Sequence, residues 1–294
     1  MYLETLGETW NRLGESDPMW AVLMAPGCER NRWDKLAFFE TGRADIVHVM
    51  HNTCHLPFPL RRGRALDFGC GLGRLTQAMA PYFDQVDGID IAPAMIRQAR
   101  AFNPYGERCR FHVNQRDDLS LFADNQFDFV LSLLVLQHMR PDYARRYVAE
   151  MLRVLAPGGL LLFQQPTHYS RQPIDVEYRP ATHWLWGRAE RWMHRAYNLL
   201  SPPPPLPRVQ NFDYSRITIP KHPYLPPVLD PQADTVRIDD DSAQPYRPPG
   251  TETHAIERWK MMLYVRRLGG RVVGIEPRNE CTPHYPSMRY YVTK

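Results

Sequence analysis

A run of residues between positions 67 and 73 has the types and spacing of a nucleotide-binding turn. It reads Asp67-Phe-Gly69-Cys70-Gly71-Leu-Gly73. Glycines let the backbone turn tightly and approach a ligand closely. Where such a turn opens a helix, unpaired backbone N–H groups favour an anionic group such as a carboxylate or a phosphate. The run therefore predicts a loop that binds the polar part of a cofactor.

A second acidic residue narrows the choice of cofactor. Asp90 ends the next apolar run, VDGID, at a place where a carboxylate can accept hydrogen bonds from both hydroxyls of a ribose. NAD-binding proteins share that feature, but they space their glycines as G-x-G-x-x-G. The spacing here is G-x-G-x-G, which disfavours an NAD-dependent oxidoreductase.

The elements that must position these residues are short apolar runs that alternate with amphipathic segments. We expect strands at 64–68, 85–90, 109–114, 127–133 and 159–164, with helices at 73–82, 93–102 and 141–155. A helix at about 254–268, ending at Gly269-Gly270, precedes strands at 271–276 and 288–293. This alternation indicates an α/β fold with a doubly wound, mostly parallel sheet.

The chain divides into four predicted parts. Residues 1–62 form a helical extension, 63–166 the α/β core, and 254–294 a helix and strands that complete the core. Residues 167–253 carry many of the chain's 28 prolines. We expect an aromatic-rich helix near 183–199, and the prolines exclude regular helix from the rest of the segment. Apolar residues are spread through it, so we expect an ordered insertion or lid that binds the acceptor, with a disordered linker as the alternative.

Composition sets broad limits on function. The 294 residues carry a formal net charge of +4, which is too weak by itself to imply nucleic acid. The five cysteines form no C-x-x-C pair and are expected to be free thiols in a reducing, cytoplasmic setting. The sequence contains no apolar run long enough to predict a membrane span, and its first residues do not have the pattern of a signal peptide. Oligomeric state has no signal in the sequence.

Four stretches together resemble the class I S-adenosylmethionine (SAM)-dependent methyltransferases. In chain order they are ALDFGCGLGRLTQAMA, VDGIDIAPAMIRQAR, FDFVLSLLVLQHM and LRVLAPGGLLLFQQP. The ending, GGRVVGIEP…SMRYYVTK, is similar to that family's final antiparallel strand pair. The resemblance implies a seven-stranded Rossmann-like sheet with a C-terminal antiparallel pair and SAM as the cofactor. It covers about residues 62–166 and the end of the chain.

The same resemblance assigns roles at matching positions. Asp67, Gly69, Cys70 and Gly71 would surround the methionine part of the cofactor, with Leu133 and Leu134 at its border. Asp90 would bind the ribose. The adenine would pack on Ile91 and Met95 and face the segment Asn114, Gln115 and Arg116. The family often has an acidic residue at the Gln115 position, so Gln115 departs from the pattern, and Asp117 and Asp118 are alternatives. A helix before the core would cover the cofactor with Trp33, Phe39 and Gly42, and packing in the core is the alternative role of these residues.

Two histidines are candidate general bases. A hydroxyl acceptor must lose its proton during or before methyl transfer, and an imidazole within hydrogen-bond reach can take it. His138 follows the fourth core strand and His168 follows the fifth, so both are expected beyond the carboxyl ends of the strands. Packing or capping is an alternative role for each.

A cluster of His48, His51, Cys54 and His55 has metal-binding residue types. A structural zinc usually draws ligands from two elements, whereas these lie in one predicted helix, so no metal site is assigned.

Together these features predict a methyltransferase that acts on a small-molecule, natural-product or glycan acceptor at a hydroxyl oxygen. Two alternatives remain open at this point. One is a methyltransferase directed at RNA or protein, which needs a basic groove at the strand ends. The other is a SAM-binding partner subunit without activity.

Overall fold

The computed structural model describes all residues except 1, 26, 55, 57, 172–249 and 283. The described strands form one seven-stranded sheet with the order β3-β2-β1-β4-β5-β7-β6. Five neighbouring strands are parallel: β1 (Arg64–Phe68), β2 (Gln85–Asp90), β3 (Cys109–Val113), β4 (Phe127–Ser132) and β5 (Leu155–Pro166). β7 (Tyr285–Thr293) pairs antiparallel with β5 and with β6 (Arg271–Thr282). The predicted α/β fold class, including the C-terminal antiparallel pair, is confirmed.

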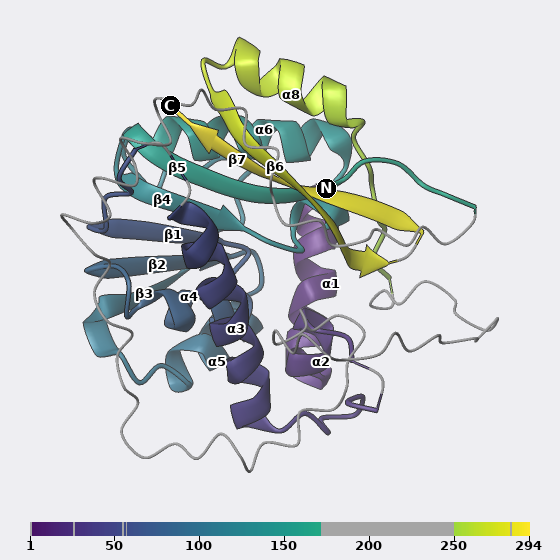
Figure 1. Cartoon of the computed structure of the whole chain (residues 1–294). Helices are drawn as coiled ribbons and strands as arrows, with labels where there is room; N and C mark the ends of the chain where they lie inside the picture. Colours follow the sequence, from purple (N-terminus) through teal and green to yellow (C-terminus); the bar gives the residue numbers. More distant parts are fainter. Residues whose placement is uncertain (1, 26, 55, 57, 172–249, 283) are drawn as a thin grey trace, which may run out of the picture.

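Helices cover both faces of this sheet (Figure 1). One face carries α3 (Lys35–Thr53), α4 (Arg74–Met79) and α5 (Pro93–Ala101), and its apolar cluster includes Ala65, Phe129 and Leu162. The other face carries α6 (Pro141–Val154) and α8 (Arg258–Arg267), and its cluster includes Leu66 and Phe163. Both faces of each central strand are therefore buried, which explains the continuous apolar runs in the sequence.

The N-terminal helices pack at the carboxyl ends of the strands. α1 (Tyr2–Ser16) and α2 (Pro18–Val22) lie beside α5 and the glycine loop. A third apolar cluster joins Ala21, Phe38 and Leu72 to the partly buried Trp10 and Leu13. This cluster fixes α1 and α2 over the end of the sheet, where ligands bind in open α/β folds.

Some element bounds differ from those expected. β5 begins at Leu155 rather than 159, because Leu155 pairs with Phe127 before a register shift in the β4–β5 ladder. β6 continues to Thr282 rather than 276, because its pairing with β7 resumes after a register shift. The last helix begins at Arg258 rather than 254 and is followed by Gly269 at φ +84°, which is the helix end that the sequence predicted. The expected helix near 183–199, and most of the predicted insertion, lie outside the described residues.

Over the part of the chain that is described, no helix has both the length and the apolar character needed to cross a bilayer.

Candidate active site

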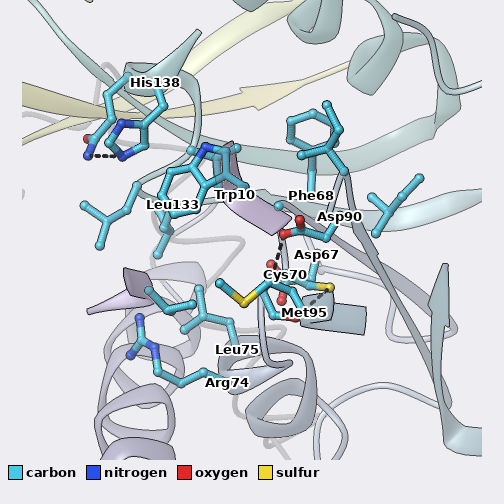
Figure 2. A pocket seen from close by; sticks show the side chains of 18 of the residues that line it. Trp10, Asp67, Phe68, Cys70, Arg74, Leu75, Asp90, Met95, Leu133 and His138 are labelled. Carbon is cyan, nitrogen blue, oxygen red and sulfur yellow. Dashed lines mark hydrogen bonds between the residues drawn. The ribbon is translucent and has the colours of Figure 1, made fainter. Parts of the chain in front are cut away.

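A cavity lies beyond the carboxyl ends of β1, β2 and β4 (Figure 2). Its floor is the glycine loop, in which Gly69, Gly71 and Gly73 have φ values of +78°, +51° and +80°. This left-handed backbone is costly for other residues. A Cβ on Gly69 would also lie 2.3 Å from Cγ2 of Val135, and one on Gly71 would lie 2.8 Å from Cγ2 of Val22. The glycines therefore allow the cavity walls to close tightly on the loop.

Asp90 and Asp67 supply the two carboxylates of the floor. Asp90 accepts hydrogen bonds from the backbone N–H groups of Gly71 at 2.8 Å and Ala92 at 2.9 Å. Burial raises the pKa of Asp90 from its ordinary value. A carboxylate has about four acceptor positions, so Asp90 can accept ribose hydroxyls in addition to these two donors.

Asp67 is fully buried at the end of β1. Its Oδ2 accepts a hydrogen bond from Thr76 Oγ1 at 2.6 Å, and burial raises its pKa to about 6. The Thr76 hydroxyl holds the carboxyl group in one orientation at the base of the cavity. The neighbouring Cys70 lines the same floor, and burial raises the pKa of its thiol.

Most of the predicted cofactor residues line this cavity. They are Asp67, Gly69, Cys70, Gly71, Asp90, Ile91, Met95, Asn114 and Leu133, with Leu134 beside them. Ile91 and Met95 give it an apolar side next to Asp90. These groups fit SAM: a carboxylate that can accept from the ribose hydroxyls, apolar side chains for the adenine, and a polar loop for the methionine part.

Four of the predicted cofactor contacts are placed elsewhere. Gln115 and Arg116 are exposed and are absent from the cavity wall, because the chain turns away after Asn114. That turn is held by Asn114, whose Nδ2 donates to the carbonyl of Asp118 at 2.8 Å. Trp33 donates from its indole nitrogen to the carbonyl of Leu23 at 3.0 Å and packs away from the cavity.

Gly42 also lies outside the cavity wall, but it acts on a residue that belongs to the wall. A Cβ on Gly42 would lie 2.5 Å from the backbone oxygen of Arg74. The glycine therefore allows α3 to approach α4 closely. In this structure Gly42 therefore has the packing role that was the alternative to covering the cofactor.

The apolar wall of the cavity includes residues that the sequence did not single out. Leu6 and Trp10 of α1 and Val22 of α2 line the cavity, as do Leu23 and Met24 beyond α2. The apolar face of an amphipathic helix predicts that the helix packs against the rest of the protein, but it does not identify the element that the face contacts. Which helix lies over the glycine loop is decided by the tertiary structure. Arg74, next to Gly73, is a lining residue that the motif itself could have indicated.

His138 lines the cavity and is 8% exposed. Its Nδ1 lies 3.3 Å from the carbonyl oxygen of Glu252, and its Nε2 lies 3.2 Å from the side-chain nitrogen of Gln137. A carbonyl can only accept and an amide nitrogen can only donate, so this network assigns the proton to Nδ1 and a lone pair to Nε2. Burial lowers the pKa of His138 to about 4.

His168, the other candidate base, is exposed and does not line the cavity. Its Nδ1 lies 2.9 Å from the hydroxyl of Thr167. The described residues therefore bring His138, and not His168, to the cofactor loop.

The described residues contain no group of three or more metal-ligand side chains. His48 contacts the buried carboxylate of Glu276, with 3.0 Å between Nε2 and Oε1.

Comparison with known proteins identifies the class of this domain. A family model described as a methyltransferase domain matches residues 66–163. The crystal structure of magnesium protoporphyrin IX methyltransferase from Synechocystis, solved with bound SAH, superposes with a TM-score of 0.53. It covers 99% of both chains at 15% identity, which supports the fold. The chain carries a class I SAM-dependent methyltransferase domain, and the cofactor of this class is SAM.

Curated relatives match at higher identity over shorter stretches. A 2-methyl-6-phytyl-1,4-hydroquinone methyltransferase of Synechocystis is 30% identical over 54% of this chain and 49% of its own length. An ajmaline N-methyltransferase of Rauvolfia serpentina is 26% identical over 56% and 60%. A ubiquinone biosynthesis O-methyltransferase of Xanthomonas euvesicatoria is 32% identical over 40% and 51%. The chain thus spans about half to three fifths of the length of these relatives.

Proposed function

We propose that this protein transfers a methyl group from SAM to a hydroxyl oxygen of a small acceptor that carries an apolar ring. The observation that carries the proposal is that His138 and the cofactor loop line one cavity. The acceptor would enter at the end of the cavity formed by α1, α2 and His138.

SAM, when bound, supplies an electrophilic methyl group on a neutral leaving group, so the protein's main work is to orient the acceptor and exclude water. Trp10 and Val22 cover the cavity with apolar surface, and Trp10 packs edge-to-face on His138 with ring centroids 5.1 Å apart. This contact fixes the imidazole ring against the cover. Nε2 of His138 would then give up the hydrogen bond that it receives from Gln137 and accept the proton of the acceptor hydroxyl.

The pKa of His138 favours an acidic hydroxyl. A histidine with a pKa of about 4 is neutral at physiological pH and ready to accept, but it is a weak base. A phenolic or enolic hydroxyl gives up its proton more easily than an alkyl hydroxyl and therefore suits this base. Two relatives give this choice of acceptor limited support: one is named as a methyltransferase of a hydroquinone, which carries phenolic hydroxyls, and the other as an O-methyltransferase of ubiquinone biosynthesis.

The test is a turnover assay with SAM and matched acceptors, each offered as the free phenol, the methyl ether and the corresponding amine. We expect release of SAH and a product heavier by one methyl group with the phenol only. Methylation of the amine and not of the phenol would show that the target atom is nitrogen and would overturn the proposed oxygen target. The ajmaline relative is named as an N-methyltransferase. Absence of SAM binding would overturn the proposal.

Variants of both histidines test the base. His138→Ala should lower kcat by about a hundredfold or more while SAH affinity stays within twofold. His168→Ala is the matched comparison, since His168 is exposed and lies off the cavity wall. A larger loss of kcat in His168→Ala than in His138→Ala would transfer the role of base to His168.

A further inference from the structure

Gln165 is a fully buried glutamine near the end of β5 that does not line the cavity. Its Nε2 donates a hydrogen bond to the backbone carbonyl of His254 at 3.1 Å. Its own side-chain oxygen is buried without a hydrogen bond within the described residues. Burying an amide costs free energy that hydrogen bonds must offset, so the contact with His254 is the feature that explains a glutamine at this position.

His254 belongs to a short segment, 251–257, that leads into α8. The backbone N–H of His254 donates to the carbonyl of Gln137 at 2.7 Å, and that of Ile256 donates to the last carbonyl of β5 at 2.9 Å. Together with the side-chain contact from β5, these hydrogen bonds tie the segment both to the end of β5 and to the turn that carries His138.

The same segment supplies the contact that selects the tautomer of His138. The backbone oxygen of Glu252 lies 3.3 Å from Nδ1 of His138, and a carbonyl can only accept, so this contact favours a proton on Nδ1 and a lone pair on Nε2. Oε2 of Glu252 also lies 3.1 Å from Nε2 of His254. The position of His254 in the segment is thereby linked to the position of the Glu252 carbonyl.

We propose that Gln165 is a positioning residue for His138. By holding the segment 251–257 on the end of β5, it keeps the Glu252 carbonyl against Nδ1 and leaves the lone pair on Nε2, the nitrogen that faces Gln137. The effect of Gln165 on catalysis rests on the proposed function, in which His138 is the base. Its effect on the tautomer does not depend on that function.

Nitrogen NMR of the full chain with isotope-labelled histidines measures the tautomer, because protonated and unprotonated ring nitrogens have well-separated shifts. The signals of His138 are those missing from His138→Gln. At neutral pH, where the imidazole of His138 is uncharged, we expect the Nδ1–H form in the unchanged protein. A predominant Nε2–H form would overturn the inference without any variant of Gln165.

Gln165→Met keeps nearly the same volume and removes the amide. The ratio of the Nδ1–H form to the Nε2–H form should fall by about fivefold or more, the usual contribution of one hydrogen bond. We expect kcat with the phenolic acceptor to fall by about tenfold, because the imidazole also loses its fixed orientation. SAH affinity should stay within twofold, which also shows that the variant is folded.

Gln85→Met is the matched control. Gln85 begins β2, at the opposite edge of the sheet from the segment 251–257, and its Nε2 is also buried. Its variant should keep both the tautomer ratio and kcat of the unchanged protein. A folded Gln165→Met that keeps the tautomer ratio of the unchanged protein would overturn the inference even if kcat falls, because that loss would then have another cause.

Gln165→Asn covers the case in which Gln165→Met does not fold. Its amide is one methylene shorter and cannot reach the carbonyl of His254, so the tautomer ratio should fall in this variant too, and an unchanged ratio would overturn the inference. A shifted ratio with an unchanged kcat has a different meaning. It would remove His138 as the base and refute that part of the proposed function, while the positioning of the imidazole by Gln165 would stand.

Discussion

The carboxylate of Asp90 accepts the backbone N–H of Gly71 at 2.8 Å, so the residue that ends β2 also fixes the loop that follows β1. Asp90→Ala should therefore remove both a ribose acceptor and a support of the loop. We expect SAH affinity to fall by about 1–3 kcal/mol, measured by calorimetry. Asp84→Ala is the control, because Asp84 is exposed just before β2. An affinity that is unchanged in Asp90→Ala would exclude Asp90 from the cofactor site.

The low pKa of His138 predicts a pH dependence of stability. The folded state has a pKa of about 4 against an ordinary value of 6.5, so between these values the unfolded state binds more protons. Stability then rises with pH across this window and is lost as pH falls. The contribution should decrease by about 2 kcal/mol between pH 7.5 and pH 5.

The measurement is the free energy of unfolding of the unchanged protein and of His138→Gln across that range. The raised pKa of Asp67, about 6, acts with the opposite sign, because the folded state there holds the extra proton. Subtracting the unfolding free energy of His138→Gln from that of the unchanged protein at each pH cancels the contributions of Asp67 and of the other groups that both proteins share. A difference that stays flat from pH 7.5 to pH 5 would refute the neutral, buried state of His138.

Gly42 is predicted to be intolerant of a side chain. Gly42→Ala would bring a methyl group to 2.5 Å from the Arg74 carbonyl oxygen and 2.6 Å from its Cγ. We expect a loss of about 1–3 kcal/mol in unfolding free energy, because α3 must move away from α4. SAH affinity should fall with it, since Asp45 and Thr41 on α3 accept hydrogen bonds from the guanidinium of Arg74, which lines the cavity. Val47→Ala, at an exposed position of the same helix, should change stability by about 0.5 kcal/mol or less.

Trp10 is predicted to affect the acceptor more than the cofactor. Its indole packs on His138 at the covered end of the cavity, so Trp10→Ala opens that end to water. With a phenolic acceptor identified as above, KM for the acceptor should rise at least tenfold while SAH affinity stays within twofold. Trp259→Ala removes a tryptophan that is 59% exposed on α8 and should leave both quantities unchanged. Equal losses for acceptor and SAH in Trp10→Ala would place Trp10 at the cofactor instead.

The sequence by itself determined the core of the fold and the cofactor loop. Strand and helix periods, together with glycines that the backbone requires at φ +78°, +51° and +80°, are local properties that leave a direct mark on the sequence. The bounds of β1 and β2 and the position of Asp90 followed from such local signals.

Only the tertiary structure decided which side chains wall the cavity, which of the two candidate histidines lies in it, and how Gly42 packs. Trp10 is about 130 positions from His138 in the chain, and no local pattern states that their rings meet. His138 and His168 each follow a parallel strand in the sequence. In the structure His138 is 8% exposed and lines the cavity, whereas His168 is exposed and lies outside it. Long-range packing sets these environments, and with them the pKa of His138 and the orientation of Arg74, because burial and partners depend on which elements come together.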